Sequence, residues 1–131
     1  MEPYKEDFRG DDGVMHVRLS GTYPKERLAS RRNLFEPLVD ACQKDKCRTA
    51  IVDARDLRVD FDTVALFRAG VDAASLNTLD LRIAFVARED QISPFFDDVL
   101  RNRGARVEIF TDMEGARSWV RGWQLPAAKQ V

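Results

Sequence analysis

Three short apolar runs divide this chain into similar units, and each run ends in a polar cluster that is typical of a helix start. The runs are Ala50-Ile51-Val52, Ile83-Ala84-Phe85-Val86 and Val107-Glu108-Ile109-Phe110. Short apolar runs that alternate with amphipathic segments predict strands alternating with helices, which is the pattern of an α/β fold. We therefore expect one small sheet whose functional groups gather where strands end and helices begin.

A β-hairpin is predicted before these units, from Phe8 to Leu19. Asp11-Asp12-Gly13 is a turn signal, and the apolar residues Met15, Val17 and Leu19 then alternate with polar ones. This alternation places the apolar residues in the core and His16 on the polar face, where we expect a solvated imidazole. Gly21-Thr22-Tyr23-Pro24 is expected to break the strand.

The remaining elements follow from apolar spacing and helix-start signals. We expect strands over Thr49–Asp53, Leu81–Ala87 and Ala105–Phe110, and about four helices in all. Pro37 predicts a kink in the first helix, or a fresh start with Asn33 as its cap. The second helix is expected from Phe61 to about Leu76, and the third from Ser93-Pro94 to Gly104. Thr111 to Glu114 has capping-box spacing, and the last helix presents Ala116, Trp119, Val120 and Trp123. The fold class is thus α/β, with about five mostly parallel strands and an N-terminal antiparallel hairpin.

Composition narrows the functional class. At 131 residues the chain suits one domain over residues 1–131, with an ordered core of about 4–124. A formal net charge of -1 gives no overall attraction to phosphate polymers, so we expect no nucleic-acid partner. The charged N-terminus and the lack of a long apolar run predict no secretion signal, no transmembrane segment and a cytoplasmic location. Cys42 and Cys47 are expected to be reduced thiols, one on a helix face and one at its end.

The residues that catalysis requires are sparse. No closely spaced glycines form a phosphate cradle, and His16 is the only conventional base for a serine or cysteine nucleophile. An acidic cluster after the third strand contains Asp53, Asp56, Asp60 and Asp62, with Arg55 and Arg58 interleaved. Such carboxylates can perform acid-base work or hold Mg²⁺, but the helix dipole alone also favours acids before a helix. We predict no catalytic residue, no cofactor and no metal site.

The order and spacing of several weak markers resemble the STAS superfamily, in particular its small SpoIIAA-like, anti-sigma-factor-antagonist branch, from roughly Val14 to Trp123. The markers include Gly21, the strand Ile51-Val52-Asp53, the pair Asp62-Thr63 and Asn102-Arg103-Gly104. Antagonists of this family carry an acid-hydroxyl motif at the start of the second helix, and a kinase phosphorylates its first hydroxyl. The resemblance implies Thr63 as the phosphoacceptor, although Val64 and Ala65 replace the serine and glycine of that motif.

Three hypotheses about function remain open at this point. The first is a non-enzymatic regulatory domain, monomeric or homodimeric, that binds a protein through Leu57 to Phe67, with Asp60, Asp62, Thr63 and Phe67 at the contact. The second, suggested by a similarity to the SEC14 architecture, is a carrier of an apolar small molecule or lipid. Its pocket would be lined by Leu66, Val71, Phe95 and Phe96. The third is an enzyme that binds a divalent ion in the Asp53–Asp62 loop.

Overall fold

The computed structural model describes residues 3–23, 35–58, 81–91 and 107–129. These segments form five strands, two α-helices and one short 3-10 helix. In chain order the elements are β1 (Lys5–Asp11), β2 (Val14–Thr22), α2 (Phe35–Lys44), β3 (Thr49–Arg58), β4 (Arg82–Val86), η2 (Glu89–Gln91), β5 (Val107–Phe110) and α5 (Met113–Lys129). The helices predicted over 61–76 and 93–104 lie outside the described residues.

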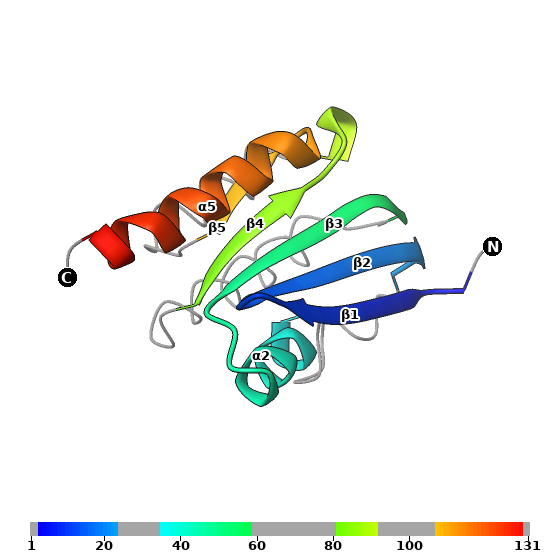
Figure 1. Cartoon of the computed structure of the whole chain (residues 1–131). Helices are drawn as coiled ribbons and strands as arrows, with labels where there is room; N and C mark the ends of the chain where they lie inside the picture. The colour runs from blue at the N-terminus through cyan, green and yellow to red at the C-terminus, as the bar shows by residue number, and fades with distance from the viewer. Residues whose placement is uncertain (1–2, 24–34, 59–80, 92–106, 130–131) are drawn as a thin grey trace.

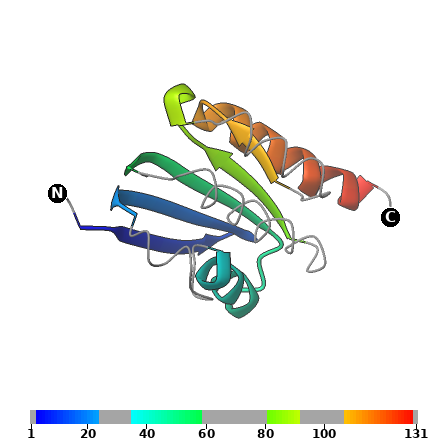
Figure 2. The same cartoon turned by 180° about the vertical axis from the view of Figure 1, so that it is seen from behind.

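The strands form one sheet in the order β1-β2-β3-β4-β5. Strand β1 pairs antiparallel with β2, whereas β2, β3, β4 and β5 are mutually parallel. Figures 1 and 2 show α2 on one side of this sheet and α5 on the other, along β4 and β5. The predicted α/β class, with a mostly parallel five-stranded sheet and an N-terminal hairpin, is confirmed.

The hairpin turn consists of Asp12 and Gly13, whose φ angles are 54° and 80°. Two consecutive residues with positive φ characterise the type I′ turn, which Asp-Gly favours and which matches the twist of the strands. Both strands are longer than predicted, and β2 continues through Gly21 instead of breaking there. Gly21 has a φ of 80° and a Cβ there would lie 2.0 Å from the Pro3 carbonyl oxygen, so glycine lets the N-terminal segment cross close to β2.

Helix α2 begins at Phe35, which places Pro37 in the first turn, where its missing N–H is not needed. The cap predicted at Asn33, which would distinguish a fresh start from a kink, lies outside the described residues. The helix ends in a Schellman motif, because Lys46 has a φ of 57° and the Cys47 N–H donates to the Cys42 carbonyl at 2.8 Å. Both cysteines are buried free thiols, on the helix face and just past its end as predicted.

Each face of the sheet carries its own apolar cluster. The cluster on the α2 side spans β2, β3 and β4, and we call this side of the sheet the α2 face; its members include Met15, Val17, Leu19, Leu38, Cys42, Ala50, Val52 and Ile83. The cluster under α5 is smaller and contains Val14, Ile51, Ala84, Val86, Ala116 and Val120. We call the α5 side of the sheet the outer face. Its apolar part lies mainly on β3 and β4, while β1 and β2 present mostly polar residues there.

Helix α5 is capped by Asp112, whose Oδ1 accepts a hydrogen bond from the Gly115 N–H at 2.6 Å. The cap therefore lies one residue after the predicted Thr111, and the capping box does not form as expected, because the helix begins only at Met113. Trp119 packs against Phe110, with ring centroids 6.0 Å apart. The helix continues to Lys129. No helix among the described residues combines the length and apolarity that crossing a membrane requires.

Candidate functional site

A β-bulge in β3 brings several charged residues to the outer face of the sheet. In the pairing of β2 with β3, Arg18 is opposite Asp53 but Ser20 is opposite Asp56. Two residues of β3, Ala54 and Arg55, therefore correspond to the single residue Leu19 of β2. One of these two, Ala54, is buried, while Arg55 is partly exposed. Bulges redirect side chains in this way and are common next to functional sites.

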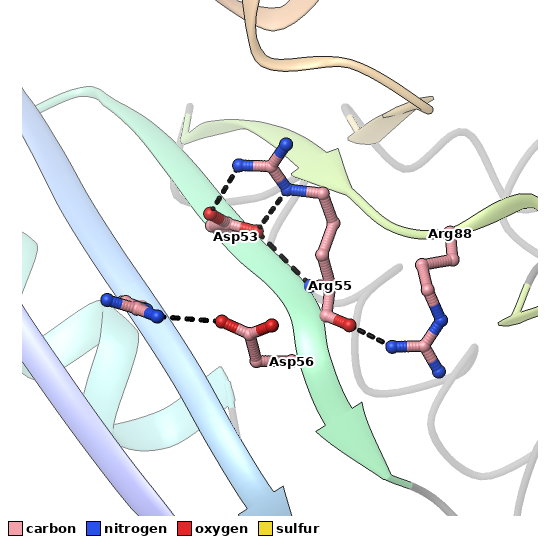
Figure 3. A network of polar contacts seen from close by, with 5 residues as sticks. Asp53, Arg55, Asp56 and Arg88 are labelled. Atoms are coloured by element: carbon pink, nitrogen blue, oxygen red, sulfur yellow. Dashed lines mark hydrogen bonds and ion pairs between the residues drawn. The ribbon is translucent and has the colours of Figure 1, made fainter.

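Arg55 and Asp53 form a two-pronged ion pair within β3. The Arg55 Nε donates to Asp53 Oδ1 and its Nη2 to Oδ2, each at 2.9 Å, and the Arg55 backbone N–H also donates to Oδ1 at 3.2 Å. The fork geometry of the guanidinium matches both carboxylate oxygens and fixes the position of each side chain. Figure 3 shows this pair on β3.

Two further arginines extend the contacts to neighbouring elements. Arg18 of β2 donates to Asp56 of β3 at 2.7 Å, and this pair is well exposed, at 65% and 58% of the side chains. Arg88, just after β4, donates through Nη1 to the Arg55 carbonyl (Figure 3). Strand β4 pairs with β3 only as far as Asp53, so the Arg88 guanidinium satisfies a carbonyl beyond the end of that ladder. We call Arg18, Asp53, Arg55, Asp56 and Arg88 the edge network.

The pKa shifts of Asp53, Arg18 and Arg55 keep these three side chains of the edge network charged. The hydrogen bonds from Arg55 lower the pKa of Asp53 against the opposing effect of burial, so this carboxylate stays ionised in the neutral range. The hydrogen bond to Asp56 likewise raises the pKa of Arg18. An ionised Asp53 is a poor proton donor, and both of its oxygens accept hydrogen bonds from the Arg55 guanidinium. Among the residues that the structure describes, no group of three or more His, Cys, Asp or Glu side chains could hold a metal.

This arrangement corrects the predicted acidic loop. Asp53 and Asp56 do not follow the third strand but lie within it, because β3 runs to Arg58 and pairs with β2 up to Thr22. The sequence contains a signal for the bulge: apolar Val52 and Ala54 are two residues apart, but the next apolar residue, Leu57, follows after three. Asp60 and Asp62 lie outside the described residues.

Burial is the main cause of the pKa shifts of two titratable groups outside the edge network. His16, predicted to be solvated, is half-buried, and burial together with the charges of Arg9 and Arg117 lowers its pKa. Burial raises the pKa of the Cys42 thiol to about 12, which keeps it protonated and weakly nucleophilic.

The residues predicted to bind partner or ligand lie outside the described residues. They are Asp60, Asp62, Thr63 and Phe67 for the protein contact, and Leu66, Val71, Phe95 and Phe96 for the apolar pocket. Two residues of the predicted contact segment are described: Leu57 is buried in the core and Arg58 is exposed. Asp56 of the edge network directly precedes this segment in the sequence. The sequence had not led us to predict that Arg18 or Arg88 belongs to the edge network.

Comparisons with known proteins bear on the fold. No protein-family model matches the chain, and no curated protein matches it significantly. Among solved structures, an anti-sigma factor antagonist from Mycobacterium paratuberculosis is 17% identical, with a TM-score of 0.55 over 91% of this chain and 95% of that one.

A second similar structure is an uncharacterised protein of the DUF3478 family with a SpoIIAA-like fold from Shewanella loihica. It is 13% identical, with a TM-score of 0.52 over 91% of this chain and 94% of that one. The NMR structure of the protein TM1081 is 20% identical, with a TM-score of 0.52 over 92% of this chain and 89% of that one. The chain therefore has the SpoIIAA-like fold that its sequence resembles.

Proposed function

We propose that this chain is a non-enzymatic regulatory domain that binds a partner protein through the edge network and the adjoining segment 57–67. The observation that carries the proposal is the edge network itself, in which exposed charges of both signs are held in place before any partner arrives. Such preorganised surfaces favour specific protein partners, because complementary charges guide encounter and exclude wrong partners. The SpoIIAA-like fold supports the same class, since one structure of similar fold is an anti-sigma factor antagonist.

The balance of charge favours a protein over other partners. The edge network contains three arginines and two aspartates, and each aspartate is paired with an arginine. Nucleic acids and anionic membranes attract surfaces with a large excess of positive charge, which this pairing removes. A protein surface with its own mixed charges is the partner that this pattern complements.

Charge exchange at the exposed Arg18–Asp56 pair tests the proposal. The double variant Arg18→Asp/Asp56→Arg keeps an ion pair between β2 and β3 but inverts its direction, so the fold is preserved while the displayed pattern changes. Affinity purification of the chain from native extract, followed by mass spectrometry, identifies bound proteins. The wild type and the control Lys44→Glu, an exposed change on α2 across the sheet, should retain the same stoichiometric partner.

We expect the double variant to bind that partner roughly tenfold more weakly or worse, because like charges then face each other across the contact. Asp62→Lys and Phe67→Asp extend the test into segment 57–67 and should have the same direction of effect. A partner that all three variants retain at wild-type strength, with thermal denaturation showing each variant folded, would refute the proposed surface. Phosphopeptide mass spectrometry of the purified chain tests Thr63 as phosphoacceptor.

A further inference from the structure

A second cluster of charged residues lies on the outer face, away from the edge network. Arg9 of β1 and His16 of β2 are direct cross-strand partners in the antiparallel hairpin. Residues opposite each other in such a pair project to the same face of the sheet, with Cβ atoms roughly 5 Å apart. The pairing therefore places a guanidinium and an imidazole side by side on the face that α5 partly covers.

Helix α5 contributes Arg117 to the same place. Ala116 and Val120 form the buried stripe of the helix, and a helix turns by about 100° per residue, so Arg117 and Trp119 flank this stripe on opposite sides. Trp119 contacts Phe110 of β5, at the far edge of the sheet. Arg117 consequently lies on the flank that faces β2, where its charge is close enough to lower the pKa of His16.

The two arginines of this cluster differ from those of the edge network. Arg18 and Arg55 each donate to a carboxylate, and Arg88 donates to Asp90 as well as to the Arg55 carbonyl. Arg9 and Arg117 are exposed, and no carboxylate among the described residues forms an ion pair with either guanidinium. Two guanidinium groups from different elements, neither of them in an ion pair among the described residues, thus flank one half-buried imidazole.

We propose that Arg9, His16 and Arg117 form a binding site for the phosphate group of a small molecule, either inorganic phosphate or a phosphate monoester. Two guanidinium groups approaching from β1 and α5 need acceptor oxygens that point in different directions, which a tetrahedral phosphate supplies and a planar carboxylate does not. Two positive charges also match a dianion, and the imidazole adds a third donor. This site does not depend on the protein partner proposed above.

The charges around His16 give the site a measurable property. Arg9 and Arg117 disfavour the imidazolium, Asp11 at the end of β1 favours it, and the residue opposite on β3 is the uncharged Ile51. A bound phosphate neutralises the two arginines and accepts a hydrogen bond from the ring, so phosphate binding should raise the pKa of His16. Asp11 repels the anion, so Asp11→Asn should strengthen binding.

His16 is the only histidine of the chain, so its ring signal in NMR spectra reports on this site without ambiguity. We would titrate the full chain with inorganic phosphate, glycerol phosphate and acetate at constant ionic strength, and repeat the pH titration with and without each anion. The expected result is a saturable shift of the His16 signal and a raised pKa with phosphate or its monoester. Whichever of inorganic phosphate and glycerol phosphate binds more tightly shows whether the site takes the free ion or a monoester.

Variants separate a built site from general charge attraction. Arg9→Gln and Arg117→Gln should each weaken phosphate binding roughly tenfold, since each removes one charge-assisted contact. Lys44→Gln on α2 removes the same charge at a distance and should have no effect. The proposal is overturned by a non-saturable phosphate response, by acetate binding of equal strength, or by equal binding in Arg9→Gln, Arg117→Gln and Lys44→Gln.

Discussion

The two faces of the sheet differ in the kind of side chain that the same strands present. On the α2 face, Met15 and Leu19 of β2 lie in a continuous apolar cluster that reaches across to Ile83 of β4. On the outer face the same β2 presents His16 and Arg18, and apolar packing under α5 is concentrated on β3 and β4. The α2 face therefore holds the fold together, whereas β1 and β2 leave the outer face available for charged contacts.

Adjacent residues of β2 should differ most in their effect on stability, because they lie on opposite faces of the sheet. Leu19 has no exposed surface on the α2 face, so Leu19→Ala should lower the free energy of unfolding by about 2–5 kcal/mol through lost burial and a cavity. Arg18→Ala, one residue earlier and on the outer face, should lower the free energy of unfolding far less, since its ion pair is exposed. Urea denaturation measures both, and equal losses would contradict the division between the faces.

Gly21 of β2 and Gly122 of α5 differ in the space around the position where a Cβ would lie. Gly21→Ala puts a Cβ against the Pro3 carbonyl at positive φ, so we expect a loss of at least about 1–2 kcal/mol in unfolding free energy. Gly122 of α5 has open space around its Cβ position, and Gly122→Ala should stabilise the chain by up to about 1 kcal/mol through higher helix propensity. Thermal denaturation of the two variants should shift in opposite directions; a gain from Gly21→Ala would show that the N-terminal segment does not cross β2 closely.

The sequence predicted the fold because its strongest patterns are local. The period-two alternation through Met15, Val17 and Leu19 and the Asp12-Gly13 turn specify the hairpin without reference to the rest of the chain. The edge network was not predictable in the same way. Its Arg18–Asp56 pair joins residues 38 positions apart, and it forms only because a bulge shifts the register between β2 and β3.

The length of β3 was also not predicted. Two Asp and two Arg occur among the six residues after Val52, and aspartate is disfavoured in strands, so the segment was expected to be a loop. Pairing with β2 and the ion pairs to arginine overcome this weak local preference. The α5 cap differs for a local reason instead, since the side chain that accepts the Gly115 N–H is that of Asp112 and not that of Thr111.

The α5 cap provides a prediction of intermediate size on the outer face. Asp112→Ala removes the acceptor of the Gly115 N–H and should lower the free energy of unfolding by about 1 kcal/mol. Thr111→Ala, just outside the helix, should change it by less than about 0.5 kcal/mol. Denaturation of both variants, together with helix content from circular dichroism, decides whether Asp112 or Thr111 caps α5. A larger loss of stability in Thr111→Ala than in Asp112→Ala would support the capping box predicted at Thr111.

The smallest effect concerns the edge network and has a defined dependence on pH. The folded state lowers the pKa of Asp53, chiefly through its hydrogen bonds from Arg55, so the stability from this pair is present at neutral pH. It should be lost as the pH falls from the ordinary aspartate range through the lowered folded-state pKa, because the unfolded chain then binds the proton more readily. We expect the loss to be about 1 kcal/mol or less, since Arg55 is partly exposed to solvent.

Denaturation of the wild type and Asp53→Asn between neutral and acidic pH isolates this contribution. Their difference in unfolding free energy should shrink toward acid, where the wild-type carboxylate is also uncharged. Asp90→Asn, an exposed change in a looser pair with Arg88, is the matched control and should follow the wild-type curve. A constant difference between wild type and Asp53→Asn would mean that Asp53 contributes through packing and not through charge, which would leave the edge network without its most ordered ion pair.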